Sequence, residues 1–146
     1  MTGLVQFKSF VYRTSVDNVR GRSAVLHSGN KPALAVSAPL EFKGDPALWN
    51  PEDLFVASIE VCLMLTFVGI AERKGLAFVS YSSTAEGLLE WEEDSYVFTR
   101  VVIRPEIVLP PETSATDARE VLERAHRTCL VARSTRSTIV IEPTIR

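Results

Sequence analysis

Two cysteines are the residues of this sequence best suited to chemistry. Cys62 lies inside a long apolar stretch, and Cys129 lies near the end of a second helical pattern, with acidic residues and arginines nearby. The thiolate is the reactive form of cysteine, and a free thiol with a pKa of about 8.5 is mostly protonated at neutral pH. A neighbouring guanidinium would lower that pKa by favouring the charged form. Composition by itself favours buried, unreactive cysteines, so core packing and redox chemistry both stay open.

Other chemical motifs are absent from the sequence. There is no Cys-x-x-Cys of the thioredoxin or zinc-knuckle kind, and His27 and His126 do not form a His-Glu-x-x-His pair. Neither a phosphate-binding loop nor a G-x-G-x-x-G turn is present. We therefore expect no metal ion and no bound cofactor, and no nucleophile elbow supports a Ser-His-Asp triad.

Length and charge narrow the class of protein. A chain of 146 residues fits one domain over 1–146. A net charge of −2 without a basic cluster gives no electrostatic reason to bind nucleic acid. The start of the chain lacks the long apolar segment of a signal peptide, so we expect a cytoplasmic protein. A structural disulfide would be unusual in that compartment.

The stretch 50–75 predicts a long helix. Asn50 fits the N-cap, Pro51 the first helical position, and Gly75 the stop after the last turn. Nearly every position inside it is apolar, which indicates a core helix of a soluble domain that is buried on most sides. Because Glu60 interrupts the apolar run, a membrane span is not expected. The Glu60 carboxylate must either reach solvent or find a partner.

Six further segments have the alternation or the β-branched and aromatic content of strands. They cover 5–15, 23–26, 33–37, 78–91, 96–109 and 138–141. Gly87 indicates a bulge in the fourth segment, and Pro105 indicates an edge strand or a bend in the fifth. Ser114 and Asp117 predict the capped start of a second helix. The buried face of that helix would carry Ala118, Val121, Leu122, Ala125 and Cys129. The predicted order is β-β-β-α-β-β-α-β.

Two motifs together resemble the OsmC/Ohr family, which comprises osmotically inducible protein C and the organic hydroperoxide reductases. The first is Asn50-Pro51-Glu52-x-Leu54-Phe55-x-Ala57 with Cys62 ten residues after the glutamate, and the second is Ala125-His126-x-x-Cys129. Element order and length agree, so the resemblance covers almost the whole chain. It implies an α+β fold in which two long helices are wrapped by sheets in an intertwined homodimer.

The resemblance also implies an activity. Cys62 would be the peroxidatic thiolate that reduces an organic hydroperoxide to an alcohol, and Cys129 would resolve the sulfenic acid as a disulfide. An external dithiol such as dihydrolipoamide would then reduce that disulfide. Glu52 and an arginine, either Arg20 or Arg22, would support the thiolate, with the carboxylate orienting the guanidinium because a carboxylate alone would raise the thiol pKa.

Helix geometry constrains this site. Ten residues of regular helix separate Glu52 from Cys62 by roughly 15 Å along the axis. A long arginine could bridge part of that distance, the start of the helix could be irregular, or one supporting group could come from the partner subunit, which is the arrangement that we predict. The substrate pocket would be apolar and lined by some of four residues, for which core packing is the alternative role: Phe42, Trp49, Leu63 and Phe67.

The sequence also departs from the family's reductases at particular positions. Leu130 follows the second cysteine where a proline is common, and Glu60 stands where a small residue is usual. Two alternatives to a peroxidase therefore stay open. One is a stress-associated or ligand-binding dimer without peroxidase turnover, and the other is a dimer whose cysteines are inert core residues.

Overall fold

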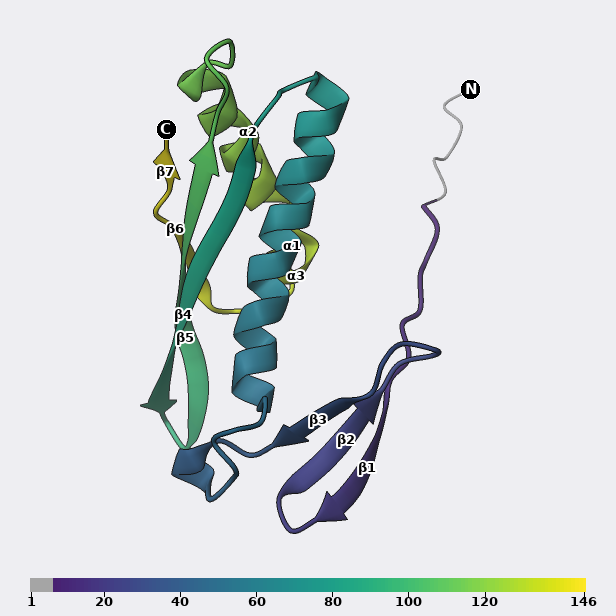
Figure 1. Ribbon diagram of the computed structural model, residues 1–146. Coiled ribbons are helices and arrows are strands. Elements are labelled where there is room, and N and C mark those ends of the chain that lie inside the picture. The colour runs from purple at the N-terminus through teal and green to yellow at the C-terminus, as the bar shows by residue number, and fades with distance from the viewer. Residues whose placement is uncertain (1–6) are drawn as a thin grey trace, which may run out of the picture. The chain divides into compact units, whose positions relative to one another are not determined.

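The computed structural model describes residues 7–146 (Figure 1). These residues form two compact units, one that ends at Pro51 and one that spans Glu52–Arg146. The predicted single domain over 1–146 stays a prediction. The two units are described in turn.

The first unit contains a three-stranded antiparallel sheet. Its strands are β1 (Ser15–Arg20), β2 (Ser23–His27) and β3 (Leu34–Ser37), in the order β1-β2-β3. Gly21 turns the chain between β1 and β2 with a φ of 54°. The Asn18 amide fixes this turn by donating to the carbonyls of Gly21 and Ser23 at 3.1 and 2.8 Å.

The predicted first strand over 5–15 is wrong. Residues 7–14 belong to no strand, β1 begins at Ser15, and residues 5 and 6 lie outside the described residues. The physical reason is pairing, because Ser15 is already opposite His27, the last residue of β2. A strand needs a neighbour to satisfy its backbone, whatever its local alternation. The second and third predicted strands are confirmed to within a residue.

The rest of the first unit leads the chain to the long helix. A short 3-10 helix, η1 (Leu40–Phe42), follows β3. The amide of Ser37 donates to the carbonyl of Trp49 at 2.8 Å, and its hydroxyl accepts from the amide of Asp45 at 2.9 Å. These bonds hold the loop that precedes the helix against the end of β3.

The second unit packs helices on one face of a sheet. β4 (Ser80–Glu92) and β5 (Ser95–Val108) form a long antiparallel hairpin, and β6 (Thr138–Ile141) and β7 (Thr144–Ile145) pair with β5 in parallel. The helices are α1 (Pro51–Lys74), α2 (Ala115–Thr128) and the short α3 (Leu130–Arg133). In Figure 1, α1 runs along the β4–β5 hairpin. The α+β class and the predicted order are confirmed, with η1, α3 and β7 added.

The ends of both long helices follow the sequence signals. α1 begins at Pro51 and stops at Lys74, and Gly75 adopts a φ of 68° that favours glycine. Ser114 caps α2 by accepting from the amides of Thr116 and Asp117 at 3.2 and 3.4 Å. The capping expected there is confirmed.

The core of this unit lies between the helices and the sheet. Twelve fully or almost fully buried residues form it: Ile59, Leu63, Phe67, Ile70, Ala71, Val101, Ile103, Ile107, Val121, Leu122, Ala125 and Cys129. Ala118 is buried as well, so the predicted buried face of α2 is confirmed. Each large side chain removed from water contributes about 1.5–3 kcal/mol.

Within the described chain, α1 is buried on one side only. Ile59, Leu63 and Phe67 face the core, while Val61 and Leu65 are 47% and 59% exposed. The prediction that most sides are buried is wrong for this chain, because the sheet and α2 cover one face. α1 is long and apolar enough to cross a membrane, a weak sign that core helices of soluble proteins also give.

The β4–β5 hairpin has an irregularity beside Gly87. The register shifts where Leu88 is opposite Arg100 and Leu89 is opposite Phe98, so the extra residue is Thr99 on β5 and not a residue of β4, where the bulge was predicted. Gly87 has a different role. A Cβ at this position would lie 2.5 Å from the Val56 methyl group and 2.8 Å from the Phe98 ring, so glycine lets α1 approach the sheet.

Pro105 lies in a central strand, so the predicted edge position is wrong. β5 has β4 on one side and β6 and β7 on the other. β6 pairs with β5 up to Ile103, and β7 pairs from Glu106 onward. Proline cannot donate to a neighbouring strand, and it sits at the break between these two partners.

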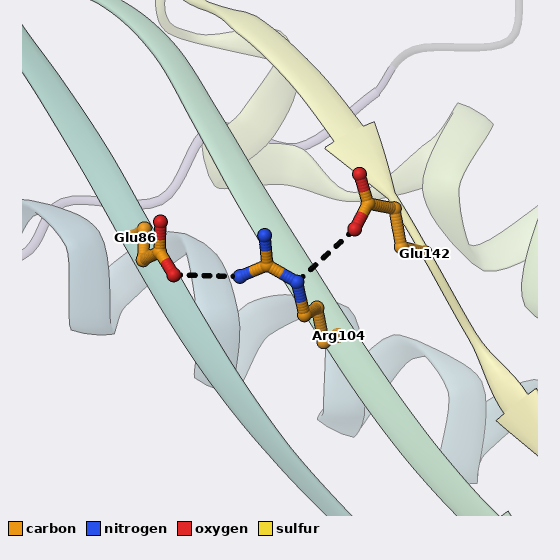
Figure 2. Close-up of polar contacts among 3 residues, drawn as sticks. All are labelled: Glu86, Arg104 and Glu142. Carbon is orange, nitrogen blue, oxygen red and sulfur yellow. Dashed lines mark hydrogen bonds and ion pairs between the residues drawn. The ribbon is translucent and has the colours of Figure 1, made fainter.

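The other face of the sheet carries charge. Arg104 donates from Nη1 to Glu86 at 2.8 Å and from Nε to Glu142 at 3.0 Å (Figure 2). These exposed side chains connect β4, β5 and the residue after β6. The alternation along β5, with Ile103 buried and Arg104 exposed, therefore separates the core from solvent.

Candidate functional site

The structure brings the two cysteines together. Cys62 lies at the middle of α1, and Cys129 lies at the junction of α2 and α3. Both are free thiols, and they lie close enough that each changes the pKa of the other. Two residues separated by most of the second unit's sequence therefore meet because α2 packs against α1.

The environment of Cys62 favours its thiolate. Partial burial would raise the pKa, but the backbone N–H groups of Val131 and Leu130, the Cys129 thiol and the Thr66 hydroxyl act in the opposite direction. Together they outweigh the burial, so the pKa of Cys62 lies below its ordinary value. Cys62 is partly exposed, so a reagent can reach its sulfur.

Cys129 has the opposite character. Its side chain is fully buried, and burial raises the pKa of its thiol to about 11, with a further increase from the neighbouring Cys62. It therefore stays protonated when Cys62 is a thiolate. The pair therefore consists of a partly exposed thiol whose pKa is lowered and a buried thiol whose pKa is raised.

Thr66 is a member of the site that the sequence analysis did not identify. Its hydroxyl donates to the Cys62 carbonyl at 2.7 Å and lies 4.0 Å from the Cys62 sulfur. The signal was available, because residues four apart on a helix are neighbours on its surface. The amides of Leu130 and Val131 depend on α3, which no clear pattern predicted.

Glu52 and Cys62 are not adjacent. Both belong to the same regular helix, so the expected separation of roughly 15 Å along the axis holds. One carboxylate oxygen of Glu52 is shielded from solvent and has no hydrogen-bond partner within residues 7–146. Such a group is unusual in a folded protein, and the described residues do not supply its donor.

The two candidate arginines lie in the first unit. Arg20 is the last residue of β1, and Arg22 follows Gly21 in the turn to β2. Both side chains are exposed in this chain. Which of them supports the thiolate stays a prediction.

The predicted apolar pocket is partly wrong. Leu63 and Phe67 are 1% and 0% exposed and fill the core, as the alternative role required. Phe42 and Trp49 belong to the first unit and are partly exposed. They stay candidates for contact with a substrate.

Glu60 is paired across the helix–sheet interface. Its carboxylate accepts a hydrogen bond of 2.6 Å from the Ser83 hydroxyl on β4. Of the two alternatives open for this carboxylate, the structure therefore provides the partner. Within residues 7–146, no cluster of three or more His, Cys, Asp or Glu side chains could hold a metal ion.

Comparison with known proteins places this architecture in a family. The family model described as OsmC-like protein matches residues 44–144, which is most of the chain. The chain therefore belongs to the OsmC-like protein family. The uncharacterized protein YmaD of Bacillus subtilis (strain 168) is 22% identical over 126 residues, covering 84% of this chain and 83% of that protein.

Two solved structures have the same fold. An OsmC-like protein of unknown function from Vibrio cholerae superposes with a TM-score of 0.86 at 23% identity, covering 93% of this chain and all of that one. An organic hydroperoxide resistance protein OsmC from Legionella pneumophila has a TM-score of 0.74 at 18% identity, covering 95% and 98% of the two chains. At these identities the likeness establishes the fold.

Proposed function

We propose that the protein is a thiol-dependent peroxidase that reduces organic hydroperoxides to alcohols. The observation that carries the proposal is the pairing of Cys62 with Cys129 in unequal environments. A peroxidatic cysteine must be an accessible thiolate, and the hydrogen bonds around Cys62 favour that form. A resolving cysteine must lie beside it and stay unoxidised until needed, which fits the buried Cys129 thiol.

The reaction follows from these two roles. The Cys62 thiolate attacks the outer oxygen of the peroxide, the O–O bond breaks, and the alkoxide takes a proton and leaves as the alcohol. Cys62 is oxidised to a sulfenic acid. Cys129 then forms an S–S bond to Cys62 while the S–O bond breaks, and water leaves. An external dithiol reduces the disulfide and is itself oxidised, so the protein needs no bound cofactor.

The substrate class is supported by a structural neighbour. The Legionella pneumophila protein is named an organic hydroperoxide resistance protein, a predicted redox protein and a regulator of sulfide bond formation. Family membership makes the same substrate class the best candidate here. Phe42 and Trp49 are the apolar side chains that we propose for contact with the organic group.

We further propose that the protein works as a homodimer. Only 28% of the residues in the most apolar part of α1 are buried in this chain, and Val61 and Leu65 leave an apolar surface uncovered. Burial of that surface against a second copy would be favourable. The unpartnered Glu52 oxygen would then find a donor, and Arg20 or Arg22 of the second copy is the candidate we favour.

Peroxide consumption tests the activity. Purified protein is mixed with cumene hydroperoxide and dihydrolipoamide, beside Cys62→Ser and Cys129→Ser. We expect enzyme-like turnover that Cys62→Ser abolishes, while Cys129→Ser leaves a sulfenic acid on Cys62 that dimedone traps. The proposal is wrong if the protein shows no turnover and forms no Cys62–Cys129 disulfide after peroxide treatment. That result would favour a ligand-binding dimer or a dimer with inert cysteines.

A second experiment tests the dimer and its arginine. Sedimentation should give twice the monomer mass, and Val61→Glu with Leu65→Glu should reduce it to the monomer. Of Arg20→Ala and Arg22→Ala, we expect one to slow the reaction of Cys62 with peroxide while the dimer persists. A monomer in the unmodified protein, or no effect of either arginine, would contradict this assignment.

A further inference from the structure

Two bonded hydroxyl groups attach the segment between α3 and β6 to the sheet. The Ser137 hydroxyl donates to the carbonyl of Phe98 on β5 at 2.7 Å and accepts from the Thr135 hydroxyl at 3.1 Å. The amide of Ser137 in turn donates to the Thr135 oxygen at 3.1 Å. Each hydroxyl uses its single hydrogen once, and both side chains are partly buried. This attachment comes just before the backbone pairing of β5 with β6, which begins at Arg100 and Thr138.

The same segment holds the end of α3. Ser134 follows the last residue of α3, and its hydroxyl donates to the Leu130 carbonyl at 2.8 Å. The amide of Thr135 donates to the Ala132 carbonyl at 3.4 Å. α3 has only four residues, and a helix of one turn is not stable by itself. Its position therefore depends on the bonds at its ends, and the bond from Ser137 connects that end to the sheet.

The start of α3 lies at the two sulfurs. Cys129 is its N-cap residue, and its first amides have no acceptor inside the helix, as at every helix start. The amides of Leu130 and Val131 donate to the Cys62 sulfur. Those of Val131 and Ala132 donate to the Cys129 sulfur. Burial raises the pKa of Cys62, and the amides are among the groups that lower it, so a displacement of α3 would change the acidity of this thiol.

We propose that Ser137 is a positioning residue of the cysteine pair: its hydrogen bond to β5 anchors α3, and α3 holds its amides against the sulfurs of Cys62 and Cys129. The inference rests on the proposed peroxidase function and adds a residue to its first step, in which the Cys62 thiolate attacks the peroxide. Ser137 acts through α3 and not by contact with the reacting atoms. A hydroxyl that only fastened β6 to β5 would change stability and leave the thiols unaffected, so thiol reactivity distinguishes the two roles.

Alkylation of Cys62 by iodoacetamide tests the proposal, because only the thiolate reacts. The rate is measured from pH 6 to pH 9 on the reduced full chain. Cys129, the ionisable neighbour, has a pKa of about 11 and stays protonated over this range. We expect Ser137→Ala to slow the reaction at pH 7 by roughly three- to tenfold, as for the loss of one hydrogen bond, and to move the profile to higher pH. Ser137→Thr keeps the hydroxyl and should react like the unmodified protein.

Thr113 provides a matched control. Its hydroxyl donates to the Ala77 carbonyl at 2.9 Å, so Thr113→Val removes a bond of the same kind between two other segments. This contact lies beyond the C-terminal end of α1, whereas Cys62 lies at the middle of that helix. We expect Thr113→Val to lower the midpoint of urea unfolding, as Ser137→Ala does, and to leave the alkylation profile of Cys62 unchanged.

A second variant keeps the test decisive if Ser137→Ala does not fold. In Thr135→Val the side chain keeps nearly the same shape, and Ser137 keeps its hydroxyl but loses both of its bonds to Thr135. The Ser137 side chain is then held less firmly against β5. The alkylation profile should move in the same direction as in Ser137→Ala, by a smaller amount.

The outcomes separate this proposal from the proposed function. The role of Ser137 is wrong if Ser137→Ala, or Thr135→Val where Ser137→Ala does not fold, keeps the profile of the unmodified protein. It is also wrong if Thr113→Val or Ser137→Thr moves the profile equally. Alkylation needs no peroxide, so a protein without turnover of cumene hydroperoxide would contradict the proposed function, while a shifted profile would still support the role of Ser137 in positioning the pair.

Discussion

The Thr66 hydroxyl, one helical turn beyond Cys62, contacts that residue twice. It donates to the Cys62 carbonyl at 2.7 Å and lies 4.0 Å from the Cys62 sulfur. A threonine hydroxyl has one hydrogen, so while it donates to the carbonyl it accepts from the thiol. When the thiol ionises, the hydroxyl can rotate and donate to the sulfur. The same side chain therefore fits both states of Cys62.

Thr66→Val tests this contact, because valine has nearly the same shape and lacks the hydroxyl. We expect the pKa of Cys62 to rise, since the hydroxyl is one of the groups that lower it. Alkylation by iodoacetamide at pH 7 should slow roughly three- to tenfold, as a hydrogen bond contributes about 0.5–1.5 kcal/mol. Thr66→Ser keeps the hydroxyl and should react like the unmodified protein. Equal rates in all three would exclude Thr66 from the site.

The raised pKa of Cys129 predicts how stability depends on pH. In the unfolded chain this thiol ionises near 9.0, and in the folded protein it ionises near 11. The folded state therefore holds the proton more tightly. The stabilisation is complete below pH 9 and is lost as the pH rises toward 11.

Urea unfolding at pH 8 and at pH 11 measures this effect against Cys129→Ser, which does not titrate. The difference in free energy of unfolding between the unmodified protein and Cys129→Ser should shrink with increasing pH. Titrating groups that do not interact with Cys129 are common to both proteins and cancel, whereas Cys62 and Tyr81, whose pKa values respond to Cys129, also contribute to the difference. A difference that stays constant between the two pH values would show that burial does not raise this pKa.

Local signals in the sequence were enough to predict the two long helices, α1 and α2. Pro51, Gly75 and Ser114 act within their own helix ends, so neighbouring residues determine their roles. Strand pairing is not local, which explains the two failures in the sheets. Residues 7–14 alternate well but pair with no strand among the described residues, and Pro105 lies where β6 ends and β7 begins beside β5.

In the candidate site, too, the residues with a local sequence signal were predictable and those that depend on tertiary packing were not. The motifs identified Cys62 and Cys129, and Thr66 could have been found from its spacing of four residues. The shielded Tyr81 hydroxyl could not, because its burial depends on how β4 packs against α1. The unequal acidity of the two thiols also depends on the amides of α3 and on burial, which appear only in the folded chain.

Gly87→Ala should destabilise the protein. The new Cβ would lie 2.5 Å from the Val56 methyl group and 2.8 Å from the Phe98 ring, so α1 and the sheet would have to separate. We expect a loss of about 1–3 kcal/mol in the free energy of unfolding, as for other overpacked sites. Urea denaturation measures it, with Leu88→Ala as control because Leu88 is half exposed. If Gly87→Ala is as stable as the control, α1 and the sheet do not pack closely at this position.

The Ser83–Glu60 hydrogen bond predicts the last result. Removing its donor in Ser83→Ala leaves a carboxylate at the helix–sheet interface without its 2.6 Å partner. The expected loss is about 1–3 kcal/mol in the free energy of unfolding. Glu60→Gln should cost less, because the amide oxygen can still accept from Ser83 and no charge is left behind. Ser82→Ala, at the exposed neighbouring position, should have little effect and serves as the control. If Ser83→Ala lowers the free energy of unfolding no more than Ser82→Ala does, water satisfies the Glu60 carboxylate. The hydrogen bond from Ser83 on β4 then contributes nothing to the packing of α1.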